Sequence, residues 1–185
     1  MRSSLLLVSL LCATACSAKP ATTAELPGSS GAVANAPRTK ELTAGDPAPS
    51  VTFTMQDGRQ VTLASLAGKE VAVYFYPKDE TTGCTIEARG LRDNWEALRA
   101  AGITVIGVST QDASSHKAFI EKEKLPYDLA VDADESVAKA FGVPVRMGYA
   151  ARHTFLVGKD GKLKKVWREV KPEGHAGEIL AAAKS

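Results

Sequence analysis

Residues 71–84 read VAVYFYPKDETTGC, and this stretch decides the fold. Its first six residues form an apolar run that is typical of a buried central strand, and Pro77 ends the run. A short loop follows, and apolar residues at helix-compatible spacing then predict a helix over residues 84–101 that stops at Gly102. A buried strand that passes through a loop into a helix is the first part of a βαβ unit.

The segments on either side extend this pattern. We predict a β-hairpin over residues 51–55 and 60–63, a strand over 103–108, a helix over 113–124, a strand over 129–131, a helix over 135–141, a second hairpin over 153–157 and 163–170, and a helix over 173–183. This order describes an α/β protein with a thioredoxin-like fold. Helices flank its central mixed sheet, and an N-terminal β-hairpin extends it.

Composition limits the classes of function. The chain has 185 residues, of which 44% are hydrophobic and 24% are charged, so it is long and apolar enough for one domain with a sizeable core. The net charge is +2, and the basic residues are scattered. This distribution does not suggest a nucleic-acid groove or a polybasic membrane patch, and we expect no nucleic-acid partner.

The N-terminus predicts export. Arg2 precedes a mostly apolar stretch over residues 5–11, small residues follow at 13–15, and we assign residues 1–15 as a signal peptide. The apolar stretch is shorter than the roughly 20 residues that span a bilayer. Cys16 follows Ala13-Thr14-Ala15, which resembles a lipobox, and this predicts a lipid anchor on Cys16 in the periplasm or cell envelope. The alternative is cleavage after Ala18, which gives a soluble product.

Two further parts follow the signal peptide. Residues 16–41 are rich in Ala, Thr, Ser, Gly and Pro and hold few large apolar residues, so they bury too little surface to offset the entropy of ordering. We interpret them as a flexible tether. Residues 42–185 carry the predicted strands and helices and form the thioredoxin-like domain.

Cys84 is the residue with the clearest chemical role. It starts the predicted helix, where backbone N–H groups and the helix dipole favour a thiolate, the nucleophilic form of the side chain. With Cys16 lipidated it is the one free thiol of the mature chain, which is unusual in an exported protein. The alternative is a small buried apolar side chain. The three histidines lie in separate elements without metal-ligand spacing, and we expect no metal site.

The residues around Cys84 resemble a known family. Pro77-Lys-Asp-Glu-Thr81-Thr-Gly-Cys84 is similar to the PxxxTxxC motif of peroxiredoxins, and Tyr74-Phe-Tyr-Pro-Lys with Gly83-Cys84-Thr85 resembles the peroxiredoxin Q or bacterioferritin comigratory protein subfamily. Further similar segments are Gly45-Asp46-Pro47-Ala48-Pro49, Gly90-Leu-Arg-Asp, Val105-Ile-Gly-Val-Ser109, Phe141-Gly-Val and Arg152-His-Thr-Phe-Leu-Val. The resemblance covers residues 42–184.

The resemblance implies a site and a reaction. Cys84 would attack the peroxide, Thr81 would orient it, Arg152 would stabilise the thiolate and the leaving oxygen, and Pro77 would shield the pocket and fix the loop. The implied activity is that of a thiol-dependent peroxidase, which reduces hydrogen peroxide and small organic hydroperoxides through a sulfenic acid. The reaction needs no metal or organic cofactor.

The chain departs from the subfamily at two positions. Many members carry a resolving cysteine five residues after the peroxidatic one, and that position here is Arg89. We therefore predict a one-Cys cycle, in which a thioredoxin-like protein or a small thiol reduces the sulfenic acid. Separately, we expect a monomer. Arg89 either favours the thiolate or lies in solvent. Thr82 replaces a common proline, which should loosen the loop.

Two other functions remain open at this point. One is an envelope thiol-disulfide oxidoreductase, which the absence of a CxxC motif disfavours because exchange needs a resolving thiol. The other is a non-catalytic module with the same fold, in which Cys84 serves a redox-sensing or holdase role. Insulin reduction would support the first, and chaperone activity independent of Cys84 would support the second.

Overall fold

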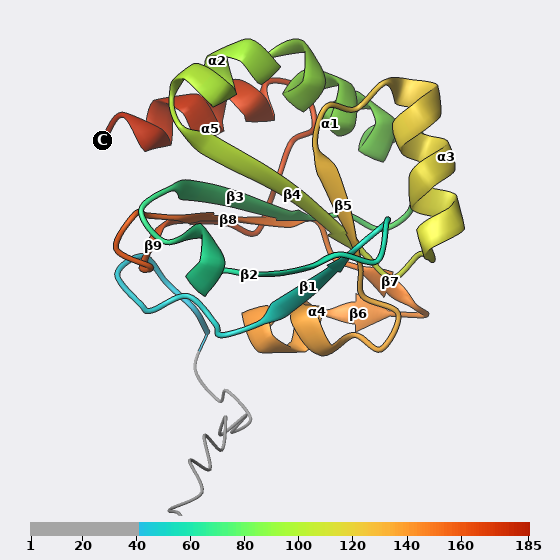
Figure 1. Ribbon diagram of the computed structural model, residues 1–185, viewed down its shortest axis with the longest axis horizontal. Coiled ribbons are helices and arrows are strands. Elements are labelled where there is room, and N and C mark those ends of the chain that lie inside the picture. The colour runs from blue at the N-terminus through green and yellow to red at the C-terminus, as the bar shows by residue number, and fades with distance from the viewer. Residues whose placement is uncertain (1–40) are drawn as a thin grey trace, which may run out of the picture. The chain divides into compact units, whose positions relative to one another are not determined.

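A seven-stranded mixed sheet forms the centre of the computed structural model, which describes residues 41–185 (Figure 1). The strands run in the order β2-β1-β5-β4-β3-β8-β9. Their bounds are β1 Thr52–Met55, β2 Gln60–Thr62, β3 Glu70–Phe75, β4 Ile103–Ser109, β5 Asp128–Val131, β8 His153–Val157 and β9 Leu163–Trp167. β3 pairs in parallel with β4 and antiparallel with β8, so the strand that leads to Cys84 is central to the sheet.

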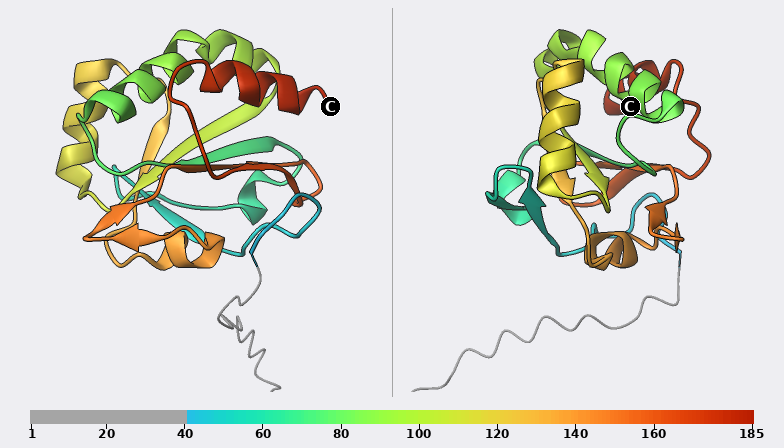
Figure 2. Two further views of the ribbon diagram at one scale, coloured as in Figure 1. Left: turned by 180° about the vertical axis from the view of Figure 1, so that it is seen from behind. Right: turned by 90° about the vertical axis from the view of Figure 1, so that its right-hand side faces the viewer.

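Helices cover both faces of the sheet. Helices α1 (Thr82–Asp93), α2 (Trp95–Ala100), α3 (Ala113–Glu123) and α5 (His175–Ala183) cover one face, and α4 (Ser136–Phe141) lies on the other (Figures 1 and 2). All six residues of β3 are buried. Because side chains alternate along a strand, Tyr74 and Tyr76 belong to the core beneath α1, whereas Val73 and Phe75 belong to the core above α4.

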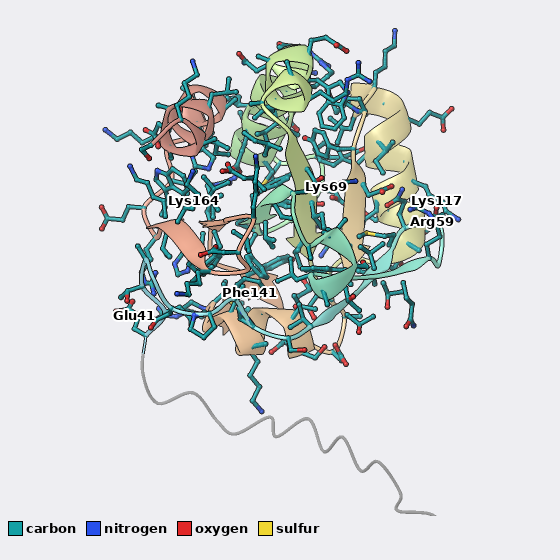
Figure 3. The ribbon with its side chains drawn as sticks, turned by 60° about the vertical axis from the view of Figure 1, so that its left-hand side comes forward. Glu41, Arg59, Lys69, Lys117, Phe141 and Lys164 are labelled. Atoms are coloured by element: carbon teal, nitrogen blue, oxygen red, sulfur yellow. The ribbon has the colours of Figure 1, made fainter. Side chains whose placement is uncertain are left out.

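Long side chains join the layers at both faces. Phe141 of α4 meets the sheet aromatics, with ring centroids 5.4 Å from Phe75 and 4.9 Å from Phe155 (Figure 3). Lys164 of β9 lies on the other side, and its Nζ donates to Glu70 Oε1 at 2.9 Å and to the carbonyl of Ala183 at 3.0 Å. These contacts fix α4 against the sheet and the end of α5 against β9.

Gly107 of β4 lets Tyr74 pack closely over the sheet. A Cβ atom at this position would lie 2.5 Å from Leu129 Cδ2 and 2.7 Å from Tyr74 Cζ, closer than real Cβ atoms approach other atoms. The Tyr74 hydroxyl donates to the hydroxyl of Tyr127 at 3.3 Å, and Tyr127 donates to the carbonyl of Ala88 in α1 at 3.0 Å. The close packing thus supports the helix that carries Cys84.

The predicted fold class is confirmed, and the N-terminal hairpin forms as β1 and β2, with β1 joined to the sheet through β5. The prediction of one helix over residues 84–101 was wrong in detail. That segment breaks at Asn94, whose side-chain amide donates to the carbonyl of Gly90 at 2.8 Å and ends α1.

The ends of two other predicted elements also differ. β9 ends at Trp167, because Arg168 turns to pair with Glu41 and donates to the carbonyl of Leu42 at 2.7 Å. α5 begins at His175, after Gly174 with its φ of 81°.

Short elements outside the seven-stranded sheet were not predicted. They are a 3-10 helix, η1 (Ala64–Leu66), and a two-stranded hairpin of β6 (Val145–Arg146) and β7 (Tyr149–Ala150). Within residues 41–185 no helix is long and apolar enough to cross a membrane. The predicted signal peptide, Cys16 and nearly all of the tether lie outside the described residues.

Candidate active site

Cys84 is the third residue of α1, and its side chain is 1% exposed. Thr81 is the N-cap residue of this helix: its backbone angles are extended, and its carbonyl accepts the N–H of Thr85 at 2.8 Å. Tyr74, Tyr76 and Ala88 belong to the same buried cluster as Cys84. The thiol therefore lies at the N-terminus of a helix that is fixed on the sheet, rather than on a mobile surface loop.

The start of α1 offers hydrogen-bond donors. The first turn of a helix leaves its N–H groups without carbonyl partners in the helix, and Thr81 does not cap them with its side chain in the described structure. These N–H groups belong to the helical turn that contains Cys84 and carry the positive end of the helix dipole, which stabilises negative charge. The same groups suit an oxygen atom that becomes negative during a reaction.

Arg152 contacts Cys84 although the two residues are 68 positions apart in the sequence. It directly precedes β8, and its Nη2 donates to Cys84 Sγ at 3.2 Å. Its side chain is 18% exposed, so its charge acts in a partly desolvated place. Gly83 leaves room for the approach, because a Cβ there would lie 3.2 Å from Arg152 Nη2, a tight contact. The guanidinium thus brings a positive charge and a hydrogen-bond donor to the sulfur at the start of the helix.

Glu87 is the counter-charge of Arg152. It lies one turn after Cys84, it is 1% exposed, and its Oε2 accepts a hydrogen bond from Arg152 Nη1. Its other oxygen, Oε1, is buried without a hydrogen-bond partner in the described part of the chain. Burial raises the pKa of Glu87 to about 7, although the charge and hydrogen bond of Arg152 act to lower it. The protonation of this carboxyl therefore changes near neutral pH.

Pro77 and Thr81 lie on the loop in front of the helix. Pro77 is half-buried and lines a pocket of about 400 Å³ together with Arg146, Tyr149 and Ala151, the residue before Arg152. The exposed Thr81 donates its hydroxyl to the carbonyl of Lys78 at 3.1 Å. The predicted site residues therefore share one end of the sheet, with Arg152 in contact with Cys84 and Thr81 one helical turn away.

The position of Arg89 bears on the two alternatives left open for it, an effect on the Cys84 thiolate or exposure to solvent. Its Nε donates to Glu123 Oε2 at 2.6 Å and its Nη2 to Oε1 at 3.2 Å, and its side chain is 54% exposed. Arg89 thus joins α1 to α3 in an ion pair. Its guanidinium is engaged there rather than at Cys84.

Sequence reasoning left several residues near the site without an assigned role. Glu87 stands three positions after Cys84, one helical turn, a spacing that allows it either to influence the thiolate or to cap the helix, and it was left out of the predicted site. Asp79 lies inside the quoted motif but was given no role, and His116 was interpreted only as a histidine without metal-ligand spacing. Among the described residues no group of three or more His, Cys, Asp or Glu side chains converges in a way that would hold a metal ion.

Comparison with known proteins tests the family resemblance independently of the geometry of the site. A model of the AhpC/TSA family matches residues 44–166. The chain belongs to the AhpC/TSA family. A curated relative of this AhpC/TSA protein, a peroxiredoxin bcp from Coxiella burnetii, is 41% identical over 143 residues, which are 74% of this chain and 95% of the relative.

Solved structures agree with this AhpC/TSA assignment. The bacterioferritin comigratory protein of Xanthomonas campestris, described for its alkyl peroxide reduction activity, is 35% identical with a TM-score of 0.68, over 72% of this chain and 90% of that one. Peroxidoxin BcpB from Mycobacterium tuberculosis is 29% identical with a TM-score of 0.73, over 78% and 97%. The resemblance to the peroxiredoxin Q and bcp subfamily is therefore confirmed.

Proposed function

We propose that this protein is a thiol peroxidase that reduces hydrogen peroxide and small organic hydroperoxides with Cys84. The observation that carries the proposal is the contact of 3.2 Å between Arg152 Nη2 and Cys84 Sγ at the start of α1. A cation and unpaired helix N–H groups beside one cysteine favour the thiolate and can hold a peroxide oxygen. The peroxiredoxin relatives support this assignment.

The reaction balances with these residues alone. The Cys84 thiolate attacks one peroxide oxygen, an S–O bond forms, and the O–O bond breaks. The sulfur loses two electrons and becomes a sulfenic acid, while the leaving oxygen takes up a proton and departs as water or an alcohol. Arg152 and the first-turn N–H groups stabilise the charge on the leaving oxygen, and Thr81 and Pro77 shape the approach.

We propose that the sulfenic acid is reduced by an external thiol. Residues 41–185 contain no second cysteine, and Arg89 occupies the position of the resolving cysteine and pairs with Glu123. The external thiol attacks the sulfenic sulfur and expels water, which gives a mixed disulfide, and a second thiol then releases Cys84. A thioredoxin-like protein or a small thiol supplies these electrons.

We also propose that the enzyme acts as a monomer in the cell envelope. The support for the envelope location is the N-terminal sequence, in which Arg2, the apolar residues 5–11 and the small residues 13–15 precede Cys16. A lipid on Cys16 and a tether over residues 16–41 would hold the domain at a membrane surface. Replacement of Cys16 by Ala should leave a slower-migrating precursor, and unchanged processing would remove the lipoprotein assignment.

Stopped-flow fluorescence of the reduced protein mixed with hydrogen peroxide tests the activity. We expect a fast second-order phase in the wild type and no such phase in Cys84→Ser. An equally slow wild type would refute the peroxidase. Insulin reduction by the wild type would support the oxidoreductase instead. Protection of a client protein from aggregation that is equal in the wild type and in Cys84→Ser would support the holdase.

A further inference from the structure

One buried carboxylate, that of Asp79, holds the loop between β3 and α1 by side-chain hydrogen bonds. Asp79 is 4% exposed and accepts three side-chain hydrogen bonds. The Tyr76 hydroxyl donates to its Oδ1 at 2.7 Å, the Ser115 hydroxyl donates to its Oδ2 at 2.6 Å, and His116 Nδ1 lies 2.8 Å from Oδ2. Two of these three partners come from α3, so Asp79 joins the active-site loop to a different helix.

His116 completes the connection on the side of the sheet. Its side chain is fully buried, and its Nε2 lies 3.2 Å from the carbonyl of Ala130 in β5. Its Nδ1 also lies 3.4 Å from the Tyr76 hydroxyl. His116 therefore bridges the Asp79 carboxylate and the sheet through its two ring nitrogens.

The pKa shifts of Asp79 and Tyr76 agree with these hydrogen bonds. Burial acts to raise the pKa of Asp79, but hydrogen bonds from His116, Ser115 and Tyr76 and the charge of His116 together hold it below the ordinary value. Burial and the charge of Asp79 raise the pKa of Tyr76 well above its ordinary value, so its hydroxyl keeps the proton that it donates. A buried carboxylate with three side-chain hydrogen-bond partners is well satisfied.

The backbone immediately after Asp79 takes a conformation that needs such support. Glu80 has a φ of 61°, in the left-handed region that residues with a Cβ seldom adopt. Its side chain makes an ion pair with Lys122 of α3 at 3.2 Å, but both side chains are about half exposed, and such pairs contribute little. Thr81 follows directly, and Cys84 lies one helical turn further on. A buried anchor at Asp79 therefore sets the path of the chain into the reactive helix.

We propose that the buried Asp79–His116 pair positions the peroxide site, by holding Thr81 and the first turn of α1 in the arrangement in which they receive the peroxide. The proposal rests on the peroxidase function proposed above. Asp79 and His116 touch neither Cys84 nor Arg152 in any hydrogen bond among the described residues, so they are positioning residues. Loss of the pair should leave the thiol in place but misalign the groups around it.

Two variants and one control isolate this role. Asp79→Asn keeps the shape of the side chain and removes its charge, and His116→Gln removes the imidazole ring that bridges Asp79 and the sheet. The control is Asp112→Asn, which removes an exposed carboxylate from the start of α3, where Asp112 Oδ1 accepts the N–H of Ser115 at 2.8 Å. Asn also serves as an N-cap, so this control leaves the loop and the helix intact.

Each variant is tested with two reagents on Cys84, hydrogen peroxide and iodoacetamide. Alkylation needs a reachable thiolate but none of the groups that orient a peroxide. We expect the second-order rate constant with peroxide to fall by about tenfold in Asp79→Asn and in His116→Gln, with alkylation nearly unchanged. Asp112→Asn should match the wild type with both reagents. An equal fall with both reagents, or wild-type peroxide rates in both variants, would overturn the proposal.

The double variant tests whether the two residues act as one unit. If the two residues act only through each other, the second replacement adds no further loss. The rate constant of the double variant with peroxide should then be about tenfold below that of the wild type, whereas independent residues would lower it about a hundredfold. The hundredfold loss would overturn the pair. A slow peroxide reaction in the wild type itself would instead refute the peroxidase, so the two failures are distinguishable.

Discussion

Replacement of Glu87 by Gln should stabilise the protein at neutral and alkaline pH. Glu87 is buried beside Arg152, and one of its oxygens has no hydrogen-bond partner among residues 41–185. Its ionised form is therefore poorly solvated in the folded state, despite the ion pair. Glutamine keeps the size of the side chain and resembles the protonated carboxyl, so the variant avoids the cost of a buried negative charge.

The magnitude follows from the pKa of this group. It rises from 4.5 to about 7 on folding, mainly through burial. Because the folded state holds the proton up to about pH 7 while the unfolded state loses it near 4.5, the wild type loses stability as pH rises through this window. At about 1.36 kcal/mol per pH unit, the full difference is about 3 kcal/mol. The Gln variant lacks this loss.

Urea denaturation at a series of pH values measures the effect. We expect the free energies of unfolding of Glu87→Gln and the wild type to lie closest at pH 4.5, and the variant to gain until it is more stable by about 3 kcal/mol at pH 8. Glu123→Gln is the matched control. Hydrogen bonding by Arg89 lowers the pKa of Glu123, so its stabilising contribution is present above the unfolded pKa and is lost as pH falls. The control variant should therefore be less stable than the wild type at pH 8.

The opposite signs of the two Gln variants make the test decisive. A free-energy difference between Glu87→Gln and the wild type that does not change from pH 4.5 to pH 8 would show that Glu87 titrates normally. A loss of stability at pH 8 in both variants would show that its ion pair with Arg152 outweighs the burial. Either result would refute the assignment of Glu87 as a carboxyl that titrates near neutral pH.

Three further changes test the rest of the site and its support. Arg152→Met removes the donor to Cys84 Sγ and should slow oxidation by peroxide by about 10²–10³-fold in stopped flow, and an unchanged rate would contradict its role. Thr81→Val should slow the same reaction by about tenfold, while Thr81→Ser, which keeps the hydroxyl, should react like the wild type. Gly107→Ala forces a Cβ against Leu129 and Tyr74 and should lower the free energy of unfolding by about 1–3 kcal/mol in urea, an effect that ordinary surface substitutions lack.

Much of the fold is predictable because local pattern and burial agree. The apolar run of β3 and the hairpin predicted over residues 51–55 and 60–63 depend on neighbouring residues, and the structure places both as expected. The break at Asn94 was not predictable from periodicity, since apolar spacing continues through it to Leu98. A side-chain bond to the carbonyl of Gly90 ends the helix there.

The site is less accessible to sequence reasoning because its contacts join distant segments. Arg152 lies 68 positions after Cys84, and its role was predicted only through the resemblance. The meaning of Glu87 depends on the approach of Arg152, and that of Asp79 depends on His116, 37 positions away. Spacing along one helix or loop cannot reveal such pairs, because the sheet topology brings them together.

The central claim is that Cys84 is oxidised by peroxide and reduced by a thiol from outside its own domain. Treatment of the mature protein with one equivalent of hydrogen peroxide, followed by a small thiol, tests it by intact mass and peptide mapping under non-reducing conditions. We predict one sulfenic acid and then one mixed disulfide, both on Cys84. An internally cross-linked monomer, or oxidation that persists in Cys84→Ser, would contradict the account.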